Sequence, residues 1–190
     1  MLCKKIDYVV TYVDDTDLNW QKLFNERKSE FKLGDDEYKR RYSKNTLFKY
    51  VFRGLEKNMP WINDVYLVVQ SYSQVPEWID AKKVKIVKHD EFIPAECLPT
   101  FNSNVIEDFL HMIKPLGELF IYGNDDMFIL DECYPSDFFD GSRPRNNIQV
   151  IKSENDYYSR KMIRTNRLIE KKLGIPEGPS SSYYTAYHVQ

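Results

Sequence analysis

Two adjacent carboxylates directly follow a short apolar segment of the chain. Residues 119–122 (LFIY) are predicted to form a buried strand, and Gly123-Asn124-Asp125-Asp126 comes at once after it. In open α/β sheets the ligand crevice lies at the carboxyl ends of the strands. Asp125 and Asp126 at such an end suit a hard cation, Mg²⁺ or Mn²⁺, which would neutralise the diphosphate of a nucleotide-sugar. The alternative is that Asn124 and Asp126 form an Asx-turn and that Asp125 caps the next segment.

A second acidic group follows the first predicted strand. Residues 6–13 are β-branched and aromatic, and Asp14, Asp15 and Asp17 come directly after them. The near-continuous apolarity is typical of a strand that is covered on both faces, as in a parallel sheet. Because both acidic groups follow strand ends, we expect them to converge on one cleft. The alternative for Asp17 is a helix cap, where its charge favours the positive end of the helix dipole.

Hydroxyl and amide side chains precede another predicted helix. Thr100, Asn102, Ser103 and Asn104 would lie beside free backbone N–H groups at its start. That combination suits the recognition of a phosphate or a sugar. Plain helix capping is an equal alternative, because Asn104 with Glu107 three residues later resembles a capping box.

The local sequence does not indicate a functional role for one arginine and two histidines. Arg53 lies off the apolar stripe of its predicted helix, which indicates a solvated surface arginine. His89 follows an edge strand in a charged stretch, which also indicates a surface position. His188 lies close to the chain end, where the local sequence assigns it no role.

The elements that must position these residues alternate between strands and helices, which predicts an α/β fold with a mostly parallel sheet flanked by helices. The helix that contains Arg53 is predicted to begin at a Ser43 cap and to end at Asn58. The further predicted strands are 64–70, 84–88 near an edge, and 148–151; the further predicted helices are 17–31, 104–112 and 157–173, and the inner stripe of the Arg53 helix is Leu47, Tyr50, Val51 and Leu55.

Composition narrows the class of protein. The chain has 190 residues, with 27 Lys and Arg against 29 Asp and Glu, and this balance argues against a dedicated nucleic-acid binder. No run approaches the roughly 18 apolar residues of a membrane span, and the N-terminus lacks the apolar stretch of a signal peptide. Three cysteines without CxxC spacing indicate reduced thiols. We therefore expect a single cytoplasmic domain over residues 1–190.

Taken together, these segments resemble the Stealth family of sugar-phosphate transferases, which includes bacterial capsule enzymes. Residues 6–17 resemble its first region, with Trp20 just beyond. Five segments of the chain resemble the family's second region in order and spacing: FRGLEKNMPWINDVYLVV, QVPEWI, VKIVKHDEFIP, LPTFNSNVIE and LFIYGNDDMF. The likeness covers most of residues 6–130 and implies a nucleotide-sugar-transferase fold of the GT-A or Rossmann-like kind.

The sequence also departs from the family's pattern. Tyr12 replaces the family's usual tryptophan, and Asp15 replaces a glycine. The chain ends at Gln190, just after the start of the third region, and the fourth region is absent. The resemblance therefore implies either a fragment or a divergent short form.

The resemblance implies a role for individual residues. Asp125 and Asp126 would serve metal and diphosphate binding. Arg53 would contact the donor phosphates, in contrast to its surface interpretation, and His188 would assist proton removal from the acceptor hydroxyl. The residues expected to contact substrate are Asp14, Asp17, Thr100, Asn102, Ser103 and Asn124.

The resulting hypothesis is transfer of a sugar 1-phosphate from a nucleotide-diphosphate sugar to a hydroxyl of an oligo- or polysaccharide, in capsular or cell-surface polysaccharide biosynthesis. Mg²⁺ or Mn²⁺ is the expected cofactor, and peripheral association with the inner face of the membrane is a further expectation. Two alternatives stay open: a metal-dependent glycosyltransferase, and a non-catalytic nucleotide-sugar-binding fragment. The sequence makes no prediction of oligomeric state.

Overall fold

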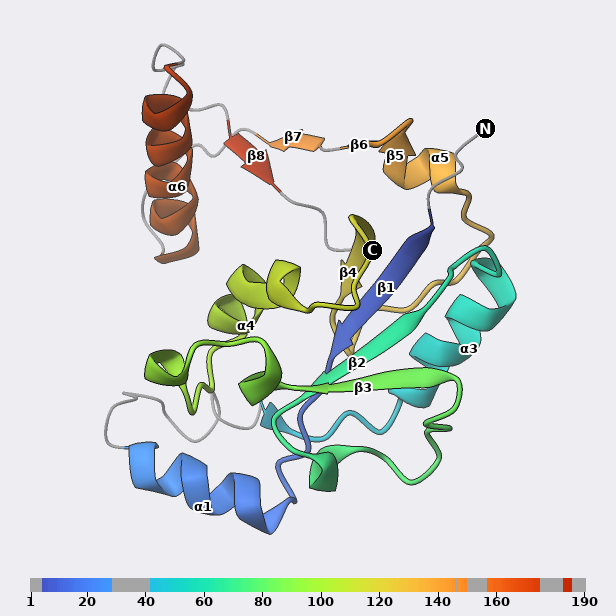
Figure 1. The fold of residues 1–190 in the computed structure, drawn as a ribbon, viewed down its shortest axis with the longest axis vertical. Coiled ribbons are helices and arrows are strands. Elements are labelled where there is room, and N and C mark those ends of the chain that lie inside the picture. The colour runs from blue at the N-terminus through green and yellow to red at the C-terminus, as the bar shows by residue number, and fades with distance from the viewer. Residues whose placement is uncertain (1–4, 29–41, 146, 150–156, 175–182, 186–190) are drawn as a thin grey trace. The chain divides into compact units, whose positions relative to one another are not determined.

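The computed structural model of the protein describes residues 5–28, 42–145, 147–149, 157–174 and 183–185 (Figure 1). The chain divides into two compact units, one that ends at Pro135 and one that begins at Ser136. The first unit contains a parallel sheet with helices on its faces, which confirms the α/β prediction. That residues 1–190 act as one domain stays a prediction.

The sheet of the first unit has four strands in the order β3-β2-β1-β4. The strands are β1 (Ile6–Thr11), β2 (Val65–Val69), β3 (Val84–Lys88) and β4 (Leu119–Gly123). All neighbouring pairs are parallel. β3 lies at an edge, as its alternating pattern predicts. Because the strands are parallel, their four carboxyl ends meet along one edge of the sheet, where ligands bind in such folds.

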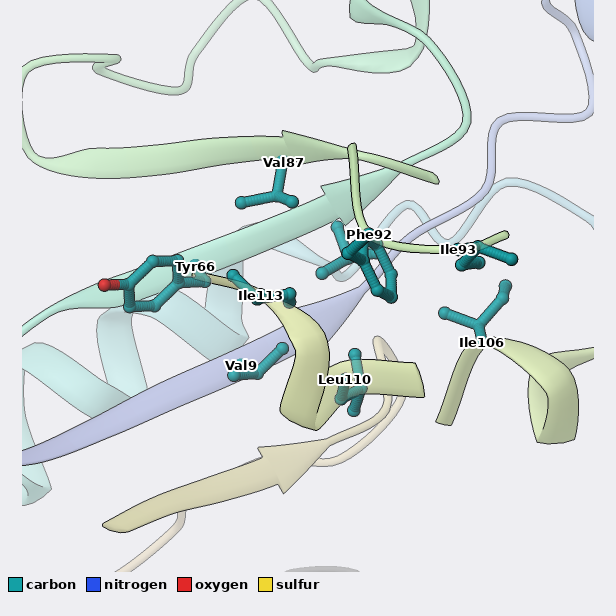
Figure 2. Close-up of a cluster of buried hydrophobic side chains, with 9 residues drawn as sticks. Val9, Tyr66, Val87, Phe92, Ile93, Ile106, Leu110 and Ile113 are labelled. Atoms are coloured by element: carbon teal, nitrogen blue, oxygen red, sulfur yellow. The ribbon is translucent and has the colours of Figure 1, made fainter. Parts of the chain in front are cut away.

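Different helices cover the two faces of the sheet. Helix α3 (Lys49–Asn58) lies on one side of the sheet, and α4 (Ser103–Phe109) lies on the other (Figure 1). On the α4 side, Val9 of β1 and Tyr66 of β2 pack against Ile106 and Leu110 (Figure 2). Both central strands are buried on both faces, as their near-continuous apolarity predicts.

A buried carboxylate ties together the other ends of the strands. Asp7 of β1 is 2% exposed. It accepts hydrogen bonds from Asn63 Nδ2 at 2.8 Å, from the Asp64 amide at 3.2 Å and from the Gly117 amide at 2.8 Å. These bonds join β1 to the segments that lead into β2 and β4, and they satisfy a charge that would be costly to bury alone.

Helix α1 (Leu18–Arg27) begins after Asp17, whose side chain accepts a hydrogen bond from the Trp20 amide at 2.8 Å. The capping alternative for Asp17 is therefore confirmed. The helix packs through an aromatic cluster of Trp20, Phe24, Tyr42 and Phe101, in which the ring centroids lie 5.0–5.5 Å apart. This cluster fastens α1 to the loop before α4.

Two predicted helix starts are wrong. α3 begins at Lys49 and not after Ser43, because residues 45–48 form a turn in which the Asn45 side chain accepts from the Leu47 amide at 2.9 Å. α4 is capped by Asn102 and not by Asn104, since the Asn102 side chain accepts from the Asn104 amide at 3.1 Å. α4 ends at Phe109, and the predicted continuation is a 3₁₀ turn, η5 (Leu110–Met112).

Three further 3₁₀ turns connect the elements of the first unit. They are η2 (Tyr72–Gln74), η3 (His89–Glu91) and η4 (Ala95–Cys97). Cys97 and Cys133 are free thiols, while Cys3 lies outside the described residues. No helix in the part of the chain that the structure describes is both long and apolar enough to cross a bilayer.

The second unit contains two short antiparallel pairs and one long helix. β5 (Phe139–Asp140) pairs with β6 (Arg143–Pro144), and β7 (Asn147–Gln149) pairs with β8 (Tyr183–Thr185). β7 confirms part of the last predicted strand, whose residues 150 and 151 lie outside the described ones. α6 (Tyr157–Leu173) confirms the predicted basic helix, and helix α5 (Pro135–Phe138) lies where the two units meet in sequence.

Candidate active site

A cavity of about 540 Å³, lined by both polar and apolar residues, opens at the carboxyl ends of all four strands. Thr11, Tyr12 and Val13 line it from the end of β1, Gln70 and Gln74 from beyond β2, His89 from beyond β3, and Asn124, Asp125 and Asp126 from beyond β4; the other lining residues are Trp20, Tyr42, Ser43, Asn45, Leu47, Thr100, Phe101, Ser103, Ile106 and Phe128. The cleft predicted at the carboxyl ends of the strands is thus confirmed as a cavity, but Asp14, Asp15 and Asp17, which were expected to converge on it, do not line it.

Asp125 is the most perturbed carboxylate of this cavity. Burial, followed by the charge of the neighbouring Asp126, raises the pKa of Asp125 from 3.8 to about 6. Burial together with the charges of Asp14, Asp125 and Asp15 also raises the pKa of Tyr12 above its usual range. The ends of β1 and β4 therefore share a region of surplus negative charge, which a bound cation would relieve.

Hydrogen bonds hold the turn that carries the two carboxylates. The Tyr122 hydroxyl donates to Asn124 Oδ1 at 2.6 Å and lies 3.1 Å from the Thr11 hydroxyl. Asn45 Nδ2 donates to the Asp125 backbone carbonyl at 2.5 Å. The Asn124 side chain is thus held by Tyr122, and no helix follows directly that Asp125 could cap. This geometry disfavours the simple Asx-turn alternative, and both Asp125 and Asp126 line the cavity.

Helix α3 supports the segment that follows the carboxylates. Asn58 Nδ2 donates to the Ile129 carbonyl at 2.8 Å, and the Cys133 amide donates to the Asn58 carbonyl at 3.0 Å. Gly54 allows this close approach, because a Cβ there would lie 2.8 Å from the Ile129 carbonyl oxygen. The carboxylates therefore sit between a rigid strand on one side and a segment anchored to α3 on the other.

The two carboxylates suit a divalent cation that keeps several other ligands. No cluster of three or more His, Cys, Asp and Glu side chains able to hold a metal occurs within the described residues. Mg²⁺ is commonly bound through one or two carboxylates, with water and substrate phosphates completing its shell. Asp125, which is partly buried, and its exposed neighbour Asp126 lie in an electronegative site and fit that arrangement.

The acidic residues after β1 are engaged in structural contacts. Asp14 binds Lys44 Nζ at 2.6 Å and accepts from the Thr16 amide at 3.0 Å. Burial alone would raise the pKa of Asp14, but the hydrogen bonds from Lys44 and Thr16 outweigh it and hold the pKa below its usual value. Neither Asp14 nor Asp17 lines the cavity. Their expected contact with substrate stays a prediction.

The loop before α4 contributes only part of the predicted set. Thr100 and Ser103 line the cavity, whereas Asn102 is used as the cap of α4. Thr100 is buried, and its hydroxyl accepts from the Asn102 amide at 3.3 Å. Thr100 and Ser103 are therefore placed where they could contact a ligand. Asn102 instead fixes the conformation of the loop through its cap of α4.

Of the two remaining predicted residues, only Arg53 is described, and it does not join this group. Arg53 is exposed on α3, with its guanidinium carbon 5.0 Å from the Tyr50 ring centre, and it does not line the cavity. This placement agrees with the surface interpretation; the phosphate contact implied by the resemblance stays a prediction. His188 lies outside the described residues.

Several cavity residues were missed from the sequence as site candidates, among them Tyr12, Gln70, Gln74 and His89. His89 is 7% exposed, so the prediction of a surface position is wrong. It packs against Phe92, with ring centres 6.5 Å apart. The signal was available, because Gln70 ends a predicted strand and His89 directly follows another, and closeness to a strand end is the criterion that singled out Asp125.

The sequence of the chain matches one protein family and several curated proteins. Residues 41–147 match the family described as Stealth protein CR2, conserved region 2. The capsular polysaccharide phosphotransferase WcwK of Streptococcus pneumoniae is 37% identical over 183 residues, which cover 84% of this chain and 53% of that relative. The receptor polysaccharide phosphotransferase WefC of Streptococcus oralis is 35% identical over 207 residues, which cover 95% of this chain and 60% of that relative.

A third relative gives the same result. The capsular polysaccharide phosphotransferase CpsJ of Streptococcus thermophilus is 37% identical over 147 residues, which cover 74% of this chain and 60% of the relative. The chain spans about half the length of the first of these curated relatives. The matched region contains β2, β3, α4, β4 and both carboxylates of the cavity. On sequence and fold together, the chain belongs to the Stealth family.

Proposed function

We propose that the chain forms the donor-binding part of an enzyme that transfers a sugar 1-phosphate from a nucleotide-diphosphate sugar to a glycan hydroxyl. The observation that carries the proposal is the pair Asp125 and Asp126, held at the end of β4 in the wall of the cavity. The names of the relatives, which are polysaccharide phosphotransferases, support transfer of a phosphorus-containing group in the synthesis of capsular or other cell-surface polysaccharide.

Asp125 and Asp126 would hold Mg²⁺ or Mn²⁺ in this enzyme. When bound, the cation supplies charge that offsets the negative oxygens of the diphosphate and of the departing nucleotide. The carboxylates contribute orientation, because Tyr122 and Asn45 hold their turn in place. Within the described lining of the cavity there is no Lys or Arg, so a diphosphate would depend on such a cation there.

The proposed reaction exchanges one bond at phosphorus for another. The acceptor hydroxyl oxygen attacks the phosphorus that bears the sugar, and the bond from that phosphorus to the bridging oxygen breaks. A nucleoside monophosphate leaves with the bridging oxygen, and the sugar and acceptor remain joined by a phosphodiester. Positioning and electrostatics dominate the rate of this kind of transfer.

The acceptor proton needs a base. His188 is the candidate that the resemblance supports, and a carboxylate of the cavity is the second. Burial and Asp126 raise the pKa of Asp125 to about 6, which brings this carboxyl closer to the range where a general base works at neutral pH. Metal binding and proton transfer are competing uses of Asp125, so His188 is the base that we propose.

Analysis of the released nucleotide tests the proposal. The full chain is incubated with nucleotide-diphosphate sugars, Mg²⁺ and an acceptor glycan, and the nucleotide products are separated by chromatography. We expect a nucleoside monophosphate together with a phosphodiester signal in ³¹P NMR of the glycan. Release of nucleoside diphosphate with a new glycosidic bond would contradict phosphotransfer and indicate a metal-dependent glycosyltransferase. Binding of the donor without turnover would indicate a nucleotide-sugar-binding domain.

A further inference from the structure

Three residues that line the cavity each contain a buried polar side-chain atom without a hydrogen-bond partner within the described residues. These atoms are Oε1 of Gln70, Oε1 of Gln74 and Nδ1 of His89. Gln74 is only 2% exposed and His89 only 7%. Buried polar groups in folded proteins are nearly always hydrogen-bonded. Three such atoms around one cavity therefore point to a ligand that supplies the missing partners.

The orientation of Gln74 defines what that partner must be. Gln74 Nε2 donates to the Asp14 backbone carbonyl at 3.3 Å. The atom left without a partner is thus the amide oxygen, which only accepts hydrogen bonds. The unpartnered atom of Gln70 is also its amide oxygen. Two acceptors on one wall require a ligand that carries N–H or O–H groups.

His89 adds an uncharged ring to this wall. Burial lowers the pKa of His89 to about 4, and the smaller opposing effect comes from Asp90. At neutral pH the imidazole is therefore neutral, with one nitrogen that donates and one that accepts. The wall presents no positive charge to an anion, and Lys88 beside it is bound to Asp90 at 3.0 Å.

A phosphate does not fit such a wall. Phosphate oxygens accept hydrogen bonds, so they would face the two amide oxygens without gaining a bond. An uncharged ring with N–H or O–H groups has the complementary chemistry. Such groups occur on both rings of a nucleotide-sugar: on its nucleoside and on the sugar that is transferred.

We propose that Gln70, Gln74 and His89 form a recess that binds an uncharged, hydrogen-bond-donating ring of the donor. This inference rests on the proposed function for the identity of the donor. β3 and β4 are the two edge strands of the sheet, so their ends lie about 14 Å apart at about 4.8 Å between neighbouring strands. The His89 end of the recess would thus lie away from the metal-bound diphosphate.

Calorimetric titration of the full chain in Mg²⁺ tests the recess with three kinds of probe. UMP, CMP, GMP and AMP carry the nucleoside, glucose 1-phosphate and N-acetylglucosamine 1-phosphate carry the sugar, and inorganic pyrophosphate carries neither ring. Gln74→Met and His89→Leu each introduce an apolar side chain of similar size and remove the unpartnered atom. We expect each to weaken one ring-bearing set about five- to tenfold and to leave the affinity for pyrophosphate unchanged.

His111→Leu is the matched control, because His111 is exposed and does not line the cavity. A loss confined to nucleotides assigns the recess to the nucleoside, and a loss confined to sugar phosphates assigns it to the transferred sugar. Unchanged affinity for both sets overturns the proposal, as does the absence of binding of every ring-bearing probe to the wild type. An equal loss for pyrophosphate overturns it too, because the recess would then not distinguish ring from phosphate.

Two further measurements keep the test valid if a buried variant fails to fold. Gln70 is only partly buried, so Gln70→Met offers a milder substitution with the same expected loss. In the wild type, methylating a ring N–H of the tightest nucleotide, or removing hydroxyls of the tightest sugar phosphate, must weaken binding; equal affinity for every such analogue overturns the recess. Release of nucleoside diphosphate in the product assay would overturn the proposed transfer and leave the recess standing.

Discussion

Replacing Asp125 by asparagine is expected to stabilise the metal-free protein at pH 7. Burial and the charge of Asp126 raise the pKa of Asp125 from 3.8 to about 6, so the fold holds the ionised carboxylate unfavourably. A raised carboxyl pKa contributes stability that is fully present below 3.8 and is lost as the pH rises through 6. A shift of about 2 units corresponds to a loss of about 3 kcal/mol at pH 7. Asparagine carries no charge and avoids this loss.

Urea unfolding in EDTA, followed by circular dichroism, measures the effect as a free energy of unfolding. We expect Asp125→Asn to raise this free energy by about 1–3 kcal/mol at pH 7. The gain should shrink towards pH 4, where the wild-type carboxyl is itself protonated in the folded protein. The matched control is Asp108→Asn, which changes an exposed carboxylate on α4 that does not line the cavity.

Magnesium should reverse the order of stability. A ligand that binds only the folded protein stabilises it, so the wild type should gain stability from Mg²⁺ with pyrophosphate, whereas Asp125→Asn should not. Two results would refute the reasoning. One is a lower free energy of unfolding for Asp125→Asn at pH 7, and the other is a gain of equal size at pH 4 and pH 7.

Three further substitutions test the elements around the cavity by urea unfolding. Gly54→Ala places a Cβ 2.8 Å from the Ile129 carbonyl oxygen and should lower the free energy of unfolding by about 1–3 kcal/mol; an unchanged value contradicts the close packing of this segment on α3. Gly123→Ala drives a methyl group into the buried Tyr8 hydroxyl and should cost about as much, and Tyr8→Phe in the same chain should recover part of the loss; no recovery contradicts that contact. The low pKa of His89, about 4 against 6.5, means that stability falls as the pH drops from 6.5 through 4, by up to about 3 kcal/mol; His89→Gln should remove this fall, and equal profiles for the two proteins contradict it.

The strands and the acidic end of β4 could be predicted because their signals are local. Val9 and Tyr66 lie in apolar runs whose length and flanks are typical of buried strands, and both are fully buried. Asp125 lies three residues after such a run. The parallel arrangement then places strand ends at one edge by geometry alone, so the location of the cavity needed no knowledge of its individual contacts.

The start of α3 could not be predicted from the same signals. Leu47 and Tyr50 complete an apolar stripe with helical spacing, yet they are 53% and 43% exposed. The Asn45 side chain donates a hydrogen bond to the Asp125 backbone carbonyl. This contact between residues far apart in sequence keeps the turn before α3 out of the helix. Local periodicity contains no record of such a contact.

The burial of His89 was hidden for a related reason. Its neighbours in sequence are the charged Lys88 and Asp90, which indicate a surface turn. In the structure those two side chains pair with each other at 3.0 Å, while the imidazole turns inward and packs against Phe92. Strand-end position, applied to every polar residue and not only to acids, would have selected His89 and Gln70 as candidates.

The fate of the phosphorus that bears the sugar tests the central claim most directly. A nucleotide-diphosphate sugar labelled with ³²P at that position is incubated with the full chain, Mg²⁺ and an acceptor glycan, and the label is located after separation of glycan from nucleotides. Sugar 1-phosphate transfer predicts that the label moves to the glycan with the sugar. Label recovered in nucleoside diphosphate, with unlabelled sugar attached to the glycan, would contradict the account.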